Sequence, residues 1–268
     1  MRRIALVFYI LVAASSMAMA GTVGADKRLA IADYAKQHKI DEPAARKLFG
    51  ASGRIMCPFN AASAFLVYKS DIVLSARHVV LPEPSMKSYA GASRPSRCAF
   101  ELSSDGEKST WYEVDVKTII YPENKERSFT DRFDWIVMKL TKPIPDVTPY
   151  ALTDTALAAD DDVTMVTLRQ DDFPHDGWNE RIVEDCKIRK VIDIDAIAGS
   201  GLKLYCSAAP GASGGALVRQ GPKGIEAVGI QSSITRSCKK FNARSCYSFA
   251  VGLSEDVRKA IRQLAGEP

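Results

Sequence analysis

The first pattern along the chain beyond residue 20 is helical. Between residues 21 and 52, apolar side chains recur at helical spacing, with Ile31, Tyr34 and Ala35 on one face together with His38. Asp41 is placed to cap a second short helix. This lead-in is either a permanent brace packed on the rest of the protein or a pro-segment that is later removed. We favour the brace, because residues 21–52 contain no evident processing site.

From Cys57 onward the pattern changes to short β-branched and aromatic runs, which predict strands. Many short strands in one chain are typical of a barrel or a sandwich. The predicted strands cover residues 64–67, 72–75, 111–120, 135–140, 163–168, 202–205, 225–230 and 247–251.

Prolines divide these strands into two groups. Residues 142–149 carry three prolines, and such a segment cannot pair as a central strand, so it predicts a linker between two lobes. The expected organisation is an N-terminal lobe over residues 53–145 and a C-terminal lobe over residues 146–268, with an active-site cleft between them. Beyond Ser254, an amphipathic stretch that ends before Gly266 predicts a C-terminal helix capped by the serine.

Residues 1–20 have the layout of an export signal. Arg2 and Arg3 precede an apolar run over residues 4–14, and small residues before Gly21 offer a cleavage site after Ala20. The run is shorter than the ~20 apolar residues that span a bilayer. We therefore expect a secreted or periplasmic protein that begins at Gly21 and has no stable membrane association after cleavage.

The net charge of the chain argues against nucleic acid as a partner but excludes no other class of function. The formal net charge of +4 falls to +2 without Arg2 and Arg3, so no strong positive field selects nucleic acid as a partner. The length that remains beyond residue 20 suits one large all-β domain or two small lobes.

Six cysteines lie beyond the signal segment, and an even number in an exported chain favours disulfides. Six cysteines allow fifteen pairings. We prefer the pairing that joins neighbours along the chain, because it keeps each bridge within one lobe. No Cys-x-x-Cys spacing supports zinc, and the acidic run at residues 160–162 is typical of a solvated loop, so no metal is assigned. The preferred bridges are Cys57–Cys98, Cys186–Cys206 and Cys238–Cys246.

The strongest local signal for chemistry is a glycine-rich turn around Ser213. A serine nucleophile must project into a cleft while backbone N–H groups of its own loop converge on the developing oxyanion, and flanking glycines permit that bend. Gly211 and Ser213 are the expected oxyanion-hole donors. Taken alone, the same pattern fits an ordinary glycine-rich hairpin turn.

His78 and Asp134 supply the partners that a serine nucleophile needs. His78 follows a predicted strand that ends in small residues, on a loop, and histidine suits the general-base role near neutral pH. The other two histidines, His38 and His175, lack this setting. Asp134 opens an apolar strand, whereas Asp131 lies in a polar stretch, so we choose Asp134 as the acid that orients the imidazole.

These three segments resemble those of chymotrypsin-like serine proteases, in that family's order of His, Asp and Ser. Residues 75–78 resemble its Ala-Ala-His-Cys motif, residues 134–138 its Asp-Ile-Ala-Leu-Leu, and residues 211–215 its Gly-Asp-Ser-Gly-Gly. The resemblance covers the chain from Cys57 to the C-terminal helix and implies two six-stranded antiparallel β-barrels. It also implies that Ser232 hydrogen-bonds the triad aspartate.

Two departures place the chain nearer to bacterial trypsin-like and glutamyl endopeptidases than to animal digestive enzymes. Ala212 stands where the digestive enzymes carry the aspartate of their activation switch, and Val79 replaces a cysteine. By the same resemblance, Ser207 forms the base of the specificity pocket, and neither it nor Gln231 supplies a charged or histidine side chain. We therefore expect a small or medium, apolar or neutral residue before the cut. The expected pocket consists of Ser207, Ala208, Ser232, Ser233 and Ile234, with Tyr247 as a further candidate.

The sequence thus predicts a secreted, monomeric serine endopeptidase that needs no cofactor and acts on proteins or peptides. Two alternatives stay open. A protein of this fold can serve as a non-catalytic binding protein. The same triad can also hydrolyse esters.

Overall fold

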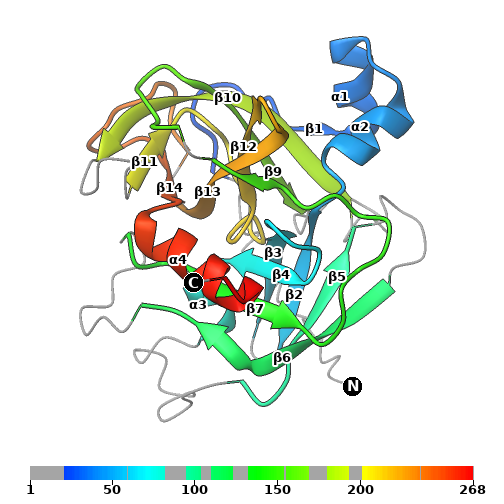
Figure 1. Cartoon of the computed structure of the whole chain (residues 1–268). Helices are drawn as coiled ribbons and strands as arrows, with labels where there is room; N and C mark the ends of the chain where they lie inside the picture. The colour runs from blue at the N-terminus through cyan, green and yellow to red at the C-terminus, as the bar shows by residue number, and fades with distance from the viewer. Residues whose placement is uncertain are drawn as a thin grey trace, which may run out of the picture.

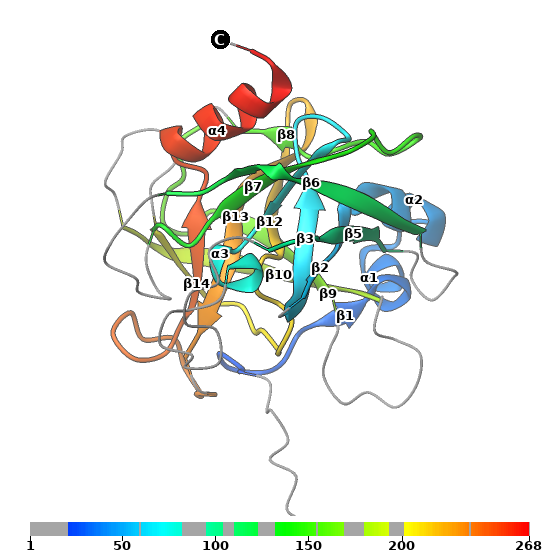
Figure 2. The same cartoon turned by 90° about the horizontal axis from the view of Figure 1, so that it is seen from below.

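The computed structural model describes residues 21–58, 60–81, 95–103, 110–122, 132–153, 155–168, 180–192, 201–235 and 237–267. The predicted export signal, His175 and Asp131 lie outside these ranges. Two β-barrels sit side by side, with helices α1 (Ile31–His38) and α2 (Glu42–Leu48) beside one and α4 (Glu255–Ala265) packed against the other (Figures 1 and 2). None of the helices in the described part of the chain has the length and apolar character needed to span a bilayer.

The first barrel closes on itself with six antiparallel strands. Its interior is apolar, because strand residues such as Phe65, Leu74 and Met138 are fully buried. In order around the ring, the strands are β2 (Ser52–Cys57), β3 (Asn60–Leu66), β4 (Ile72–Ser75), β7 (Ile136–Leu140), β6 (Thr110–Ile120) and β5 (Ala99–Leu102).

The second barrel is also a closed ring of six antiparallel strands, as β12 pairs back with β9. Its strands are β9 (Asp162–Leu168), β10 (Arg181–Ile192), β11 (Gly201–Leu204), β14 (Ser248–Gly252), β13 (Gly224–Ile234) and β12 (Ala216–Gly221). Two short strands extend the sheet: β1 (Leu29–Ala30) along β10 and β8 (Ala151–Leu152) along β13. The predicted fold of two six-stranded barrels is confirmed.

The helices lie where the periodicity places them, with two differences. The helices are α1 (Ile31–His38), α2 (Glu42–Leu48), α3 (Arg77–Val80) and α4 (Glu255–Ala265). His78 was expected on a loop but lies in the one-turn helix α3. Ser254 occupies the N-cap of α4 without a side-chain cap bond, while Gly266 ends the helix in the left-handed conformation.

The three disulfides join Cys57 to Cys98, Cys186 to Cys206 and Cys238 to Cys246, which is the pairing preferred from the sequence. The first bridge ties β2 to the residue before β5 in the first barrel. The other two lie within the second half of the chain. The acidic residues Asp160 and Asp162 pair with Arg189 and Lys187 of β10.

Candidate active site

Strand pairing brings His78 and Asp134 to the same end of the first barrel. On antiparallel strands β4 and β7, Ser75 stands opposite Ile136. Continuing that register, the residues just after β4 meet the residues just before β7. His78 follows β4 in helix α3, and Asp134 precedes β7. Two segments 56 residues apart in sequence therefore converge because their strands are hydrogen-bonded neighbours.

The Asp134 carboxylate holds His78 by two hydrogen bonds. The His78 backbone N–H donates to Oδ1 at 3.0 Å, and the imidazole Nδ1 lies 2.8 Å from Oδ2. The aspartate side chain is 5% exposed and the histidine side chain 18% exposed. A buried carboxylate that fixes Nδ1 as the donor leaves Nε2 as the basic nitrogen, on the side of the ring away from the acid.

Ser213 lies in the loop between β11 and β12, which is built from two consecutive turns. The Ala212 N–H donates to the Ala209 carbonyl at 3.0 Å, with Pro210 at the second position of that turn and Gly211 at the third, at φ 85°. Pro followed by a residue of positive φ is typical of a type II turn. The next turn repeats the pattern, because Gly215 N–H donates to the Ala212 carbonyl and Gly214 has φ 82°.

Glycine at position 214 is also required by space. A Cβ there would lie 2.1 Å from the Ser63 carbonyl oxygen and 2.2 Å from Ser75 Oγ. Ser75 belongs to β4, three residues before His78, so the Ser213 loop presses directly against the strand that carries the histidine segment. A side chain at this position would force the two barrels apart at the site.

Two backbone amides of the loop are left without protein partners. Among the described residues, no acceptor is hydrogen-bonded to the N–H of Gly211 or of Ser213. Gly211 is held in place by its carbonyl oxygen, which accepts from both the N–H (2.9 Å) and the Oγ (2.7 Å) of Ser63. Free, fixed N–H groups beside a serine are donors suited to an oxyanion.

Ser63 was missed by the sequence analysis. It lies on β3 of the first barrel, yet its Oγ also accepts from Leu168 N–H of β9 at 2.9 Å, so one serine ties both barrels to the loop. A serine inside the apolar run at residues 61–66 is a signal that could have been noticed. Its partner 148 residues away could not be read from the sequence.

Ser232 connects Ser213 to the His78–Asp134 pair. Its carbonyl oxygen accepts from Ser213 Oγ at 3.3 Å, and its own Oγ donates to Asp134 Oδ2 at 2.5 Å. The pairing of β13 with β14 shifts register between Gln231 and Ser233, so Ser232 sits at a bulge. Bulges re-aim side chains, and this one directs the hydroxyl toward the first barrel.

The residues expected to form the specificity pocket lie around the beginning of β14. Ser248 pairs with Leu204 on one side and Ile234 on the other, so the segment after β11 and the end of β13 flank the same strand. Ser207 and Ala208 are buried, while Ser233 and Ile234 are partly exposed. Gln231 is buried among them: its Nε2 donates to the Ser233 carbonyl, and its Oε1 accepts from Ser248 Oγ.

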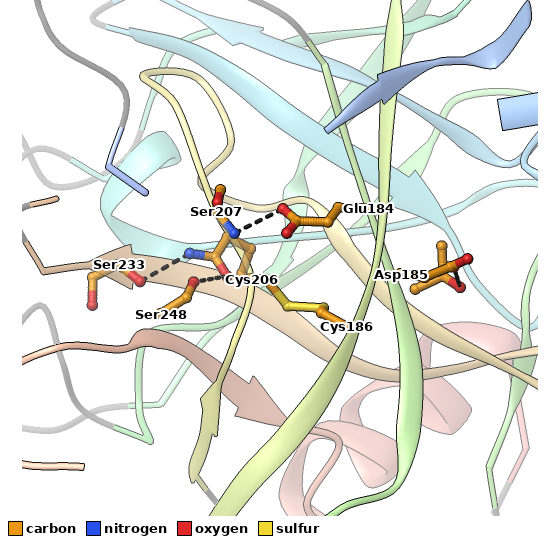
Figure 3. The surroundings of a disulfide bond; sticks show 9 residues. Glu184, Asp185, Cys186, Cys206, Ser207, Ser233 and Ser248 are labelled. Carbon is orange, nitrogen blue, oxygen red and sulfur yellow. Dashed lines mark hydrogen bonds between the residues drawn. A yellow bond between two sulfur atoms is a disulfide. The ribbon is translucent and has the colours of Figure 1, made fainter. Parts of the chain in front are cut away.

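Glu184 of β10 is a second residue that the sequence analysis missed. Its carboxylate Oε2 accepts from the Ser207 backbone N–H at 2.8 Å (Figure 3), and the residue is 2% exposed. Burial raises the pKa of the Glu184 carboxyl to about 7, although the hydrogen bond from Ser207 acts in the opposite direction. Glu184 lies in β10, and the many charged residues of this strand obscure the apolar pattern that predicts a strand.

The N-terminal segment reaches the same region. Gly21 exchanges two backbone hydrogen bonds with Ala208, at 2.8 and 2.9 Å. Thr22 and Gly24 bond the backbone of Cys238 on the far side, with its N–H donating to the Thr22 carbonyl and its carbonyl accepting from Gly24. Residues 21–24 therefore join the segment that carries Ala208 to the segment that follows β13.

No group of three or more His, Cys, Asp or Glu side chains suited to a metal ion occurs within the described ranges.

A family model described as a trypsin-like peptidase domain matches residues 62–230, which is more than half of the chain. A solved structure titled "Structure of Glu endopeptidase in complex with MPD" aligns with a TM-score of 0.68 at 11% identity, covering 92% of this chain and 100% of that one. At 11% sequence identity, this match shows that the two chains share a fold and nothing more. The search of curated proteins gives no match.

Proposed function

The chain belongs to the trypsin-like peptidase family, and from this premise we propose that it is an exported serine endopeptidase that works through an acyl-enzyme. One observation carries the proposal. A continuous set of contacts runs from His78 through Asp134 and Ser232 to Ser213, beside two backbone amides that lack protein acceptors among the described residues.

In the proposed mechanism, Ser213 is the nucleophile and His78 the general base. His78 takes the hydroxyl proton as Ser213 Oγ attacks the scissile carbonyl, then gives that proton to the leaving amine. Asp134 keeps the imidazole in the reactive tautomer and stabilises the imidazolium. The N–H groups of Gly211 and Ser213 bind the oxyanion, and water releases the acyl group by the reverse sequence of proton transfers.

Hydrolysis of matched peptide and ester substrates tests the reaction class. We expect the purified protein to cleave an internal peptide bond of a denatured protein and to acylate on a peptide substrate with release of the amine. Turnover of the ester alone, with every peptide left intact, would favour an esterase instead. A folded protein inert toward both would favour a binding protein.

Export is supported by the cysteines, because three disulfides fit an oxidising compartment and no free cysteine occurs among the described residues. We propose that cleavage follows Ala20 and that residues 21–52 stay on the mature protein as a brace. N-terminal sequencing of the exported protein is expected to begin at Gly21. A sequence that begins near Arg54 or Cys57 would show instead that the lead-in is a pro-segment.

Contacts of the lead-in with the second barrel support the brace. Strand β1 pairs with β10 at Leu29 and Ala30, and His38 Nε2 of α1 lies 2.9 Å from Asp185 Oδ2 on the same strand. Arg181 of β10 donates to the Arg46 carbonyl in α2 at 2.9 Å. The lead-in therefore contacts β10 at several points along the strand.

Removal of residues 21–24 is expected to weaken both stability and substrate binding. A mature chain that begins at Ala25 loses four backbone hydrogen bonds, two to Ala208 and two to Cys238, each worth about 1 kcal/mol. We expect Tm to fall by roughly 8–16 °C and KM to rise more than kcat falls, because the Ala208 segment of the expected pocket loses its support. Thermal unfolding and peptide kinetics measure both effects.

The exposed substitution Ala25→Gly serves as the control for that deletion, since it leaves all four hydrogen bonds in place. Gly21→Ala is a milder probe, because the new Cβ would lie 2.9 Å from the Ile234 side chain. A deletion with unchanged Tm and KM would contradict a bracing role for residues 21–24.

A further inference from the structure

Glu184 sets a carboxyl group against the segment that forms the base of the expected specificity pocket. Successive side chains of β10 point to opposite sides, so Glu184 faces Ser207 while Asp185 faces away (Figure 3). The contact is direct, because Oε2 accepts from the Ser207 N–H at 2.8 Å. Ser207 stands six residues before Ser213, next to the Cys186–Cys206 disulfide that links this segment to β10.

Two polar groups at this place lack a partner within the described part of the chain. Ser207 is fully buried, and its Oγ has no hydrogen-bond partner there. The second carboxylate oxygen of Glu184, Oε1, likewise has no hydrogen-bond partner among the described residues. Buried polar atoms are nearly always satisfied in native proteins, so the unmet Ser207 hydroxyl, on a residue whose N–H is bonded to the Glu184 carboxylate, indicates a polar ligand group that completes it.

We propose that Glu184 is a specificity-determining residue, which in its ionised form favours a lysine or arginine side chain immediately before the scissile bond. The inference rests on the proposed peptidase function and deepens it. A cationic side chain would provide the missing donors for Ser207 Oγ and for the carboxylate, and it would offset the charge that burial disfavours. An acidic side chain at the same position would be repelled.

The charge of Glu184 changes near neutral pH. Its pKa is raised from 4.5 to about 7, first by burial, then by the nearby negative charge of Asp26, while Ser207, Arg28 and Lys27 lower it. The residue opposite Glu184 on the neighbouring strand β9 is the uncharged Met165, so the charges that act on the carboxyl come from residues 26–28 of the lead-in. A carboxyl with that pKa is about 10% ionised at pH 6 and about 90% at pH 8. The pocket is therefore neutral at the lower pH and negative at the higher.

This charge revises the expectation drawn from Ser207 and Gln231 alone. A neutral residue before the cut is expected at pH 6, where Glu184 is mostly protonated. Preference for a basic residue is expected to grow as pH rises through 7. The sequence-based expectation for the specificity pocket could not include Glu184 of β10. It covered only the segment before Ser213 and the end of β13, which line the pocket by resemblance.

The test uses two peptides that differ only in the residue before the cut, lysine or methionine, which have similar length but differ in charge. The ratio of their kcat/KM values cancels the titration of His78, because both substrates need the same base. For the wild type, we expect the Lys/Met ratio to rise about ten-fold from pH 6 to pH 8. For Glu184→Gln, we expect a ratio that stays at the low-pH value throughout.

Glu113→Gln is the matched control, since Glu113 is an exposed glutamate on β6 of the other barrel. It is expected to keep the wild-type ratio at both pH values. A wild-type ratio that does not change with pH, a ratio unaffected by Glu184→Gln, or preferred cleavage after glutamate would overturn the proposal.

Binding separates this proposal from the proposed function. Product peptides that end in lysine or methionine are titrated into the Ser213→Ala variant by calorimetry at both pH values, with and without Glu184→Gln. Tighter lysine binding at pH 8 that depends on Glu184 supports the specificity role even if the wild type cleaves nothing, and absence of that difference overturns it. Lack of cleavage by itself contradicts only the peptidase assignment.

A stability measurement tests whether Glu184→Gln acts through charge rather than misfolding. The folded-state pKa lies above the unfolded value of 4.5, so the native state holds more protons between those values and stability falls as pH rises from 4.5 to about 7. Tm of the wild type is expected to fall over that range, and the fall should be smaller in Glu184→Gln. A variant less stable than wild type at pH 8 would contradict the buried-charge account.

Discussion

Ser213→Ala is expected to lower kcat/KM for peptide hydrolysis by about 10⁵-fold without loss of stability. The loss follows because no other side chain can form the acyl-enzyme, and what remains comes from substrate binding and the oxyanion donors. Ser213 Oγ makes one hydrogen bond within the described ranges, to the Ser232 carbonyl, so alanine removes little else. Peptide kinetics and thermal unfolding measure the two effects.

The matched control is Ser245→Ala, an exposed serine next to a cysteine of the third disulfide. It is expected to retain wild-type kinetics. If Ser213→Ala kept more than about one hundredth of the wild-type rate, a contaminating peptidase or a different nucleophile would be responsible. Titration with an active-site acylating reagent would distinguish the two.

Asp134→Asn is expected to lower kcat by about 10⁴-fold with a smaller change in KM. Both carboxylate oxygens accept hydrogen bonds, Oδ1 from the His78 N–H and Oδ2 from Nδ1 and from Ser232 Oγ. An amide nitrogen in place of either oxygen would face a donor. Relief of that clash favours the tautomer with the proton on Nε2, which leaves no base facing Ser213.

Asp71→Asn provides the control for that substitution. Asp71 lies next to β4 and pairs with Lys139 of β7 at 3.4 Å, so it belongs to the same two strands but at their opposite end. Its loss is expected to leave kcat unchanged. Equal losses of kcat in both variants would indicate that the β4–β7 pair tolerates no change of charge, and that Asp134 has no special role toward His78.

The sequence could predict those features that depend on local chemistry. Pro210 and Gly211 encode the first turn of the Ser213 loop because each favours the backbone angles that its position requires. The β-branched runs predicted most barrel strands, and helical spacing predicted α1, α2 and α4. These patterns, combined with the resemblance at residues 75–78, 134–138 and 211–215, were enough to select the candidate site residues.

Features that depend on distant partners could not be predicted. Strand β10 carries six charged residues among its twelve positions, and Glu184 looks in sequence like one more surface acid. Its burial and its bond to the Ser207 N–H arise from a segment more than twenty residues away in the sequence. Likewise Gly21 has no local signal for pairing with Ala208, and Ser63 none for holding Gly211. The helix α3 was missed because four residues are too few to show a helical period.

Activation of Ser213 is the central requirement of the proposed function, and labelling with a fluorophosphonate measures that activation most directly. Intact mass of the signal-free, disulfide-bonded protein is compared among the wild type, Ser213→Ala and His78→Ala. We predict one adduct on the wild type, mapped to Ser213, and none on either variant. A folded wild-type protein that gains no adduct, or one labelled equally in Ser213→Ala, would contradict the proposed catalytic site.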